Sequence, residues 1–293
     1  MRFNDRTMVV TGAASGLGRA FAIALAQRGA SLALIDNQSL MEVKRAVEAV
    51  GAEVACWQCD VADETSVSNV CQQILATFAQ VDGLVLAAGV HHSQALENMP
   101  RQVWRRQIDV DFDGAFMLCR AFWLHMKAQG YGRILLLTGA SGLFGDYFES
   151  AYATAKMGLI GLANCLSQEG LNYNIYVNTL CAHALTPMTS QHLAADVAPM
   201  FSMETPVAAA IYLMSEDAPS GQHLLAAAGS ISRAYIAQSK PLYLPAARCT
   251  PEMLQKSWSR LKAHPHPSVI RSGEEQIVKW AALASKEHGV LLK

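Results

Sequence analysis

The stretch Thr11-Gly12-Ala13-Ala14-Ser15-Gly16-Leu17-Gly18 decides the fold of this chain. It follows a short apolar run that is typical of a buried strand, and it opens into a segment with apolar residues at helical spacing. Glycine lets a backbone turn tightly and approach a ligand closely, and a new helix offers unpaired N–H groups and its positive dipole end to an anion. A strand, a glycine turn and a helix in this order predict a site for the pyrophosphate of a dinucleotide.

Apolar strand-like runs alternate with helix-period segments up to about residue 230, which is the signature of βαβ units and a parallel sheet buried on both faces. The expected strands are Met8–Thr11, Ser31–Ile35, Glu53–Gln58, Gly83–Ala87, Arg133–Leu137, Ile175–Leu180 and His223–Ala227. The expected helices are Leu17–Arg28, Leu40–Val50, Glu64–Phe78, Arg101–Gln129 and Ser150–Asn172. The pattern predicts an α/β fold of Rossmann type, with a doubly wound seven-stranded parallel sheet in a three-layer αβα sandwich.

The domain organisation follows from a change of character near residue 240. Residues 1–239 are expected to form one domain that contains the dinucleotide site. Residues 240–293 are expected to form a C-terminal helical extension, with helices near Glu252–Lys262 and Glu274–Lys286. Trp258 and Trp280 predict that this extension packs on the same domain or on a neighbouring subunit.

Composition narrows the classes of function. Because 52% of the residues are hydrophobic, the chain can bury a large core. Its formal net charge is -1, so it lacks the excess of basic residues that nucleic-acid binding requires. Its start is neither a secretory signal nor a membrane span. Seven cysteines without a disulfide framework indicate a reducing compartment, and no spacing predicts a metal site. We expect a cytoplasmic protein with a small-molecule substrate and no nucleic-acid or membrane partner.

The choice of dinucleotide is predicted from Asp36, which ends the second expected strand. An acidic side chain there accepts hydrogen bonds from an adenosine ribose and repels a 2′-phosphate, so NAD is favoured over NADP. The alternative is a solvated carboxylate at the end of a strand. The residues expected to contact NAD in this part of the chain are Gly12, Ser15, Gly16, Leu17, Gly18, Asp36, Asp60, Val61, Ala88 and Gly89.

These segments, together with Tyr152-Ala153-Thr154-Ala155-Lys156, resemble the short-chain dehydrogenase/reductase family over about residues 5–237. The narrower likeness is to the hydroxyacyl-CoA dehydrogenase domains of multifunctional enzymes. The resemblance implies hydride transfer between a nicotinamide and a carbonyl or secondary alcohol, and a homodimer or homotetramer. Residues four apart share a helix face, so the Lys156 ammonium can stabilise a tyrosinate at Tyr152 and also hold the nicotinamide ribose. Tyr152 then acts as the general acid in reduction and as the general base in oxidation. Thr186 is implied as a further cofactor contact.

Three positions depart from the family pattern. Gly139 stands where the family has its catalytic serine, and Ser141 or Thr138 could substitute for that hydroxyl. Asp111 stands where the family has an asparagine that helps to carry a proton relay, and it could hold water or pair with Lys156. His183 follows the sixth strand where the family often has Pro-Gly, and it could donate to a substrate oxygen or be a structural histidine. The candidate catalytic residues are Tyr152, Lys156, Ser141, Asp111 and His183.

Three hypotheses for the function follow from this pattern. The first is an NAD(H)-dependent oxidoreductase with an atypical site, acting on a secondary alcohol or ketone of moderate size and apolar character. The expected lining of its pocket is Phe144, Tyr147, Met188 and Met200. The second is a non-redox enzyme on the same scaffold, such as a cyclase, dehydratase or isomerase, because losing one oxyanion donor costs about two to three orders of magnitude in rate. The third is a catalytically impaired NAD-binding protein.

Overall fold

The computed structural model describes residues 1–190, 193–262 and 267–290 of the chain. The chain divides into two compact units, Met1–Arg233 and Ala234–Lys293. This division falls a few residues before the predicted one at residue 239. Among the described residues, none of the helices has the length and apolar character that crossing a bilayer requires.

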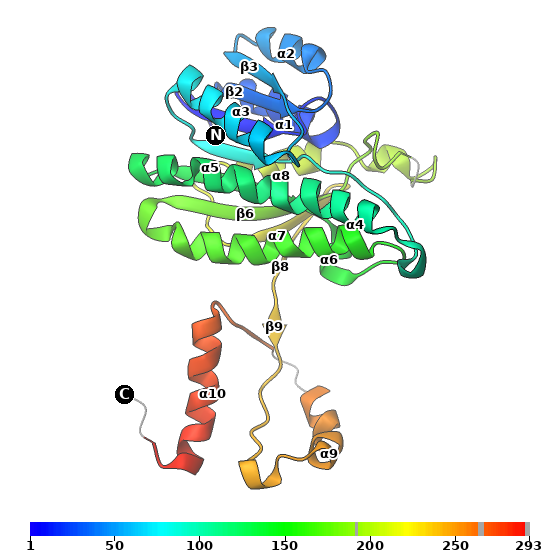
Figure 1. Ribbon diagram of the computed structural model, residues 1–293, viewed down its shortest axis with the longest axis vertical. Helices are drawn as coiled ribbons and strands as arrows, with labels where there is room; N and C mark the ends of the chain where they lie inside the picture. The colour runs from blue at the N-terminus through cyan, green and yellow to red at the C-terminus, as the bar shows by residue number, and fades with distance from the viewer. Residues whose placement is uncertain (191–192, 263–266, 291–293) are drawn as a thin grey trace. The chain divides into compact units, whose positions relative to one another are not determined.

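Within the described residues, the first unit contains one eight-stranded sheet, in the order β3-β2-β1-β4-β5-β6-β7-β8, between two layers of helices (Figure 1). Its strands are β1 Thr7–Thr11, β2 Ser31–Asp36, β3 Val54–Gln58, β4 Gly83–Leu86, β5 Gly132–Thr138, β6 Ile175–Ala182, β7 His223–Ala227 and β8 Ser230–Ala234. Neighbouring strands from β3 to β7 pair in parallel. The strand order reverses between β1 and β4, and doubly wound folds bind ligands at the carboxyl ends of the strands beside such a reversal.

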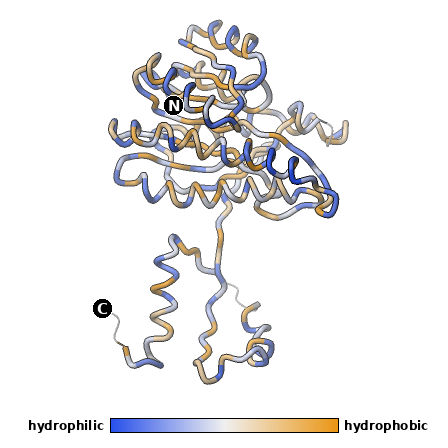
Figure 2. Tube along the Cα trace, in the orientation of Figure 1, coloured by the Kyte–Doolittle hydropathy of each residue, from blue (hydrophilic) through white to orange (hydrophobic). Residues whose placement is uncertain are grey.

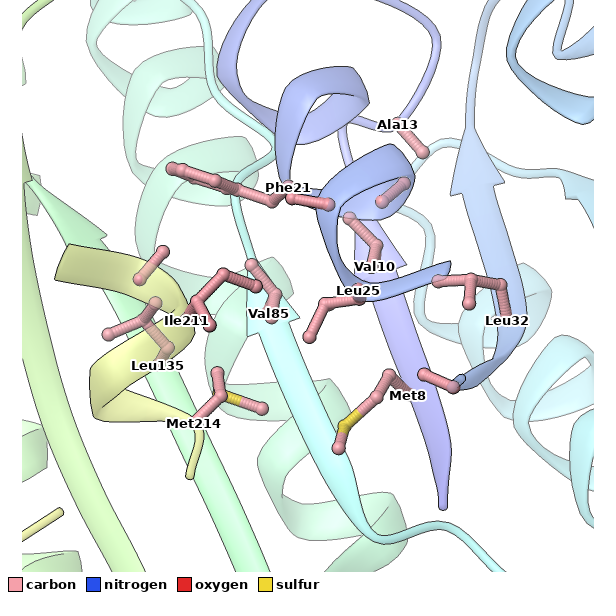
Figure 3. Close-up of a cluster of buried hydrophobic side chains, with 14 of the residues drawn as sticks. Met8, Val10, Ala13, Phe21, Leu25, Leu32, Val85, Leu135, Ile211 and Met214 are labelled. Atoms are coloured by element: carbon pink, nitrogen blue, oxygen red, sulfur yellow. The ribbon is translucent and has the colours of Figure 1, made fainter. Parts of the chain in front are cut away.

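The helices of the first unit cover both faces of this sheet. They are α1 Gly16–Ala26, α2 Met41–Glu48, α3 Glu64–Phe78, α4 Arg101–Ile108, α5 Gly114–Gln129, α6 Ala140–Phe144, α7 Ser150–Glu169 and α8 Glu204–Leu213. Successive side chains of a strand point to opposite faces. Met8 and Val10 of β1 therefore join one core with α1 and α8, which Figure 3 shows, while Val9 joins a second core with α3, α5 and α7. Because both faces are buried, the central strands carry apolar residues at consecutive positions, as β1 does at Met8, Val9 and Val10, and not only at alternate ones.

The structure differs from the sequence prediction in two places in this unit. An eighth strand, β8, follows β7 after the two residues Ala228 and Gly229, both with positive φ. Only an antiparallel partner can follow so short a connection, and the expected all-parallel sheet of seven strands did not include it. The long helix predicted over Arg101–Gln129 is interrupted by a π-helical turn, Asp109–Asp113, that separates α4 from α5. Such turns occur mostly inside α-helices, and they are frequent at functional sites.

The second unit contains two helices and a small sheet. β9 Ala237–Gln238 pairs antiparallel with β10 Ser268–Val269, and the helices are α9 Pro251–Lys262 and α10 Gly273–His288. Both helices match the predicted ones closely. Ser272 caps α10 by accepting a hydrogen bond from the Glu275 backbone, as the Ser-x-x-Glu spacing predicts. Polar and apolar residues alternate along α10 (Figure 2), and Trp258 and Trp280 are exposed.

Candidate active site

One cavity of about 440 Å³ lies at the carboxyl ends of the central strands, at the reversal of strand order. Its lining includes all of the predicted cofactor contacts, which are Gly12, Ser15, Gly16, Leu17, Gly18, Asp36, Asp60, Val61, Ala88, Gly89, Tyr152, Lys156 and Thr186. Of the predicted catalytic residues, Tyr152, Lys156, Asp111 and His183 line it as well. The topology therefore brings residues from most of the first unit to one cavity.

The glycine turn forms one end of this cavity. Gly12 has a φ of 65°, and a Cβ atom on it would lie 2.8 Å from the carbonyl oxygen of Ala87. Thr11, just before the turn, accepts hydrogen bonds from the backbone N–H groups of Ala87 and Ala88 at 3.1 Å each. The turn is thus tied to the end of β4, and only a residue without a side chain fits its closest approach. A backbone cradle of this kind fits a dinucleotide pyrophosphate at the start of α1.

Asp36 closes the same end from β2. Its two carboxylate oxygens accept hydrogen bonds from the backbone N–H groups of Ala14 and Gln38, at 2.9 and 2.8 Å. These contacts hold the carboxylate beside the glycine turn, where the sequence predicted an adenosine ribose. Asp36 is therefore not a fully solvated carboxylate at the end of a strand.

Asp60 faces the cavity from the loop after β3 and pairs with Arg106 of α4 at 2.8 Å. Burial would raise the pKa of the Asp60 carboxyl, but the hydrogen bonds from Arg106 and from the Ala62 backbone outweigh it and lower this pKa. Arg106 was not predicted from the sequence. The sequence around Arg106 does not indicate a contact with the distant loop after β3, so only the tertiary structure identifies this residue.

The opposite end of the cavity is formed by α7. Tyr152 and Lys156 lie one turn apart on this helix, and the Lys156 Nζ atom is 5.3 Å from the centre of the Tyr152 ring. Nζ donates a hydrogen bond to the Leu137 carbonyl at 3.1 Å and forms an ion pair with Asp111 Oδ1 at 2.8 Å. Burial alone would lower the pKa of Lys156, but the Asp111 carboxylate outweighs it and raises this pKa. Of the two roles expected for Asp111, the structure shows the pairing with Lys156.

The π-helical turn Asp109–Asp113 places Asp111 inside the protein, with a side chain that is 0% exposed. Its second oxygen, Oδ2, accepts hydrogen bonds from the Val90 backbone at 2.9 Å and from Gln107 Nε2 at 2.8 Å. Gln107 also donates to the Val90 carbonyl at 2.7 Å. Asp111 thus fixes both the loop after β4 and the position of Lys156. Gln107 was not predicted, although its spacing of four from Asp111 was a usable signal.

Gly139 lies directly beside Tyr152. A Cβ atom on Gly139 would be 2.9 Å from Tyr152 Cε1 and 3.0 Å from its hydroxyl oxygen. A serine here would therefore put its hydroxyl next to that of Tyr152, as the resemblance implied for the family. Thr138 lines the cavity, and its Oγ1 atom is buried without a hydrogen-bond partner among the described residues. Ser141 lies in the first turn of α6 and is not among the residues that line the cavity.

Two predicted residues approach the cavity from the segment after β6. The His183 ring packs edge-on against the Phe201 ring, with 5.1 Å between their centres, and desolvation of the ring lowers the pKa of His183. Thr186 is held by Thr189, whose hydroxyl accepts a hydrogen bond from the Thr186 backbone at 2.9 Å. Both residues can face a ligand. Among the expected apolar lining residues, Met188 lines the cavity, whereas Phe144, Tyr147 and Met200 are exposed side chains outside its lining.

A histidine and a carboxylate stand beside Tyr152, and the sequence did not reveal this pair. His91 Nε2 lies 2.9 and 2.8 Å from the two carboxylate oxygens of Glu149, and its ring contacts the Tyr152 ring edge-on at 5.1 Å between centres. The sequence marked His91 only as a residue near the mouth of the pocket. Glu149 comes from the start of α7, and no local pattern links it to His91.

Comparison with known proteins agrees with this geometry. The family model of the short chain dehydrogenases matches residues 6–197. Cis-4-hydroxycyclohexanecarboxylate dehydrogenase of Sinomonas cyclohexanicum is 33% identical over 230 residues, which cover 74% of this chain and 92% of that protein. Peroxisomal multifunctional enzyme A of Dictyostelium discoideum is 29% identical over 286 residues, which cover 94% of this chain and 64% of that protein.

The solved structure of full-length peroxisomal multifunctional enzyme type 2 from Drosophila melanogaster matches with a TM-score of 0.84 and 26% sequence identity. The match covers 98% of this chain and 50% of that one. It therefore extends beyond the sheet into the second unit, Ala234–Lys293. This chain spans only about a quarter to two thirds of the length of the multifunctional relatives that it matches.

Proposed function

This chain belongs to the short-chain dehydrogenase family, and from that premise we propose that it is an NAD(H)-dependent oxidoreductase that interconverts a secondary alcohol and a ketone on a moderately apolar substrate. The observation that carries the proposal is that the glycine turn and the pair Tyr152 and Lys156 line one cavity. Relatives with dehydrogenase names over most of this chain support an oxidoreductase activity.

The cofactor proposal is NAD(H) and not NADP(H). It is supported by Asp36, whose carboxylate is held beside the glycine turn by two backbone N–H groups. A 2′-phosphate on the ribose would bring its negative charge against this carboxylate. We propose that the glycine turn and α1 hold the pyrophosphate, that Asp36 accepts hydrogen bonds from the ribose, and that Val61 and Gly89 border the rest of the cofactor.

Bound in this cavity, the nicotinamide supplies or accepts the hydride. In ketone reduction, the Tyr152 hydroxyl donates its proton to the carbonyl oxygen, and in alcohol oxidation it takes a proton from the substrate hydroxyl. Lys156 holds its charge within reach of Tyr152 and binds the ribose. Thr138 Oγ1, which has no partner among the described residues, is a candidate second donor to the substrate oxygen, as is His183, whereas Ser141 lies outside the cavity lining.

The substrate class and the assembly are also proposals. Met188 at the cavity supports a substrate of apolar character, and the likeness to multifunctional enzymes supports an acyl thioester among the candidates. Phe116 and Leu124 of α5 and Met157 of α7 are exposed apolar side chains. They support the expected homodimer or homotetramer through these helices. The expected cytoplasmic location stays a proposal that cell fractionation tests.

The experiment follows NADH absorbance with a panel of apolar ketones, secondary alcohols and 3-hydroxyacyl thioesters, in the wild type and in Tyr152→Phe. We expect turnover of at least one member with NADH, weaker turnover with NADPH, and a loss of about 100-fold or more in Tyr152→Phe. Binding of NADH without turnover of any member would refute the proposal.

Gly139 favours a second candidate function. Without the serine hydroxyl, the site is short of one donor that hydride transfer uses, while Tyr152 and the nearby His91 and Glu149 still form an acid–base cluster. A non-redox enzyme, such as a cyclase, dehydratase or isomerase, would convert its substrate without any change in NADH absorbance. Product analysis by mass spectrometry in the same panel separates this candidate from the first.

A further inference from the structure

The ion pair between Asp111 and Lys156 is almost completely removed from solvent. The Asp111 side chain is 0% exposed and that of Lys156 is 6% exposed, with 2.8 Å between Oδ1 and Nζ. Because the two opposite charges lie only 2.8 Å apart, the electrostatic potentials that they produce at a third group largely cancel. The charge that Lys156 presents to its other neighbours is therefore much reduced.

Asp111 cannot turn away from Lys156. Its other oxygen is held by the Val90 backbone and by Gln107. A Cβ atom on Gly89 would lie 2.8 Å from Asp111 Oδ1, so the loop after β4 closes over the carboxylate. The pairing is thus built into the resting site by three separate elements of the chain.

The pairing of Lys156 with Asp111 affects the ionisation of Tyr152. An ammonium beside a phenol favours the phenolate, and Lys156, whose Nζ atom is 5.3 Å from the centre of the Tyr152 ring, acts on Tyr152 in this way. The titratable and charged groups around Tyr152 are Lys156 on the same helix, Asp111 on the π-helical turn, Cys181 on β6, Glu149 before α7 and His91 after β4. Burial, followed by Asp111, Cys181 and Glu149, raises the pKa of Tyr152, and Lys156 opposes them without reversing the result.

We propose that Asp111 sets the pH dependence of this site, because its carboxylate, paired with Lys156 at 2.8 Å and removed from solvent, neutralises Lys156 and so keeps Tyr152 protonated at neutral pH. The inference rests on the proposed function and adds to it the pH range over which reduction and oxidation proceed. In reduction, a hydride from NADH forms the new C–H bond at the carbonyl carbon, and the π electron pair of the C=O bond moves to the oxygen. That oxygen takes the proton of Tyr152, and the resulting phenolate regains a proton from solvent.

Alcohol oxidation runs these steps backwards and must begin from the Tyr152 phenolate. Because the phenolate is scarce below the raised pKa of Tyr152, oxidation is slow at neutral pH and increases as the pH rises through that pKa. Reduction needs the phenol, so it is sustained through the neutral range and decreases at alkaline pH.

The test is Asp111→Asn, which keeps the size of the side chain and removes its charge. The ionisation of Tyr152 is followed by tyrosinate absorbance, as the difference between each protein and the same protein carrying Tyr152→Phe. We expect Asp111→Asn to shift this ionisation toward acid by about one pH unit or more. The pH profile of alcohol oxidation should shift by the same amount. Asp111→Ser makes the same test if the asparagine variant does not fold.

Asp109→Asn is the matched control. Asp109 lies in the same π-helical turn and pairs with Arg105 at 2.7 Å, but both side chains are partly exposed and neither lines the cavity. We expect no shift in this variant. An unchanged Tyr152 ionisation in Asp111→Asn would overturn the inference, whatever the turnover. Absence of turnover in the wild type would refute the proposed function, while the absorbance titration would still decide the effect of Asp111.

Discussion

The two ends of the cavity differ in how the chain builds them. At the glycine turn, the close contacts are made by backbone atoms and by short side chains such as Thr11 and Asp36, which are near in sequence to the turn or at the ends of adjacent strands. At α7, the close contacts are pairings of long charged side chains from distant elements, above all Lys156 with Asp111. The backbone of the glycine turn can bind a pyrophosphate whatever the neighbouring side chains are. The paired side chains at α7, in contrast, can alter the chemistry of that end of the cavity.

The largest effect is expected at Lys156, because its buried ion pair with Asp111 stabilises the α7 end of the cavity. Lys156→Met leaves the Asp111 carboxylate buried without its cation, and breaking a buried pair in this way costs about 3–5 kcal/mol of the free energy of unfolding. Urea unfolding measures this loss. The control is Lys279→Met, which removes an exposed i,i+4 pair with Glu275 on α10 and should cost about 0.5 kcal/mol or less. Equal losses in the two variants would contradict the account.

The next effect tests the cofactor end. Gly12→Ala puts a methyl group 2.8 Å from the Ala87 carbonyl oxygen at a positive φ, so the turn must move away from the position that a pyrophosphate needs. We expect the affinity for NADH, measured by fluorescence titration, to fall by about 100-fold. Gly51→Ala also has a positive φ but meets nothing within 4 Å, so it should strain the backbone without weakening the binding of NADH.

A smaller effect is expected from restoring a hydroxyl at the reactive end. Gly139→Ser places a Cβ atom 3.0 Å from the Tyr152 hydroxyl, so the ring must shift slightly, and a second donor then stands beside the substrate oxygen. We expect kcat for ketone reduction to increase by about tenfold, a part of what such a donor is worth. Gly139→Ala adds the same Cβ without the hydroxyl and should give no increase. A gain in both variants would show that packing, and not the donor, limits the rate.

The smallest effect concerns the two adjacent histidines. His91→Ala removes the edge-on contact with the Tyr152 ring, which is worth about 0.5–1.5 kcal/mol, so kcat should fall by about two- to tenfold. His92 is exposed and its backbone, not its ring, is bound to Gln107, so His92→Ala should leave kcat unchanged. Steady-state kinetics on the two variants decide whether His91 positions Tyr152.

Most of the fold could be predicted from the sequence because the signals are local. Glycines, apolar runs and helical spacing located the strands from β1 to β7 and the two helices of the second unit, within a few residues. The eighth strand was missed because Ser230–Ala234 is polar and largely exposed, so it lacks the buried pattern of its neighbours. The π-helical turn was missed because its residues keep a helical pattern.

The candidate site could be predicted only in part: residues within one short stretch of sequence were found, and contacts between distant elements were not. The glycine turn, Asp36 and the spacing of Tyr152 and Lys156 are visible in short stretches of sequence. The pairing of Asp111 with Lys156 was one of two alternatives until the structure was known. Two contacts depend on tertiary folding, and no spacing in the sequence predicts them: Arg106 with Asp60, and His91 with Glu149.

The measurement that tests the central claim most directly is transfer of deuterium from NADH labelled at nicotinamide C4 to a ketone in the substrate panel. If the cavity binds NADH and its altered catalytic end still transfers hydride, deuterium will appear at the carbinol carbon of the alcohol product. We expect mass spectrometry to detect it with the wild type and not with Tyr152→Phe. Tight binding of the labelled NADH with no deuterium in any product would contradict this expectation and leave the cavity to non-redox chemistry.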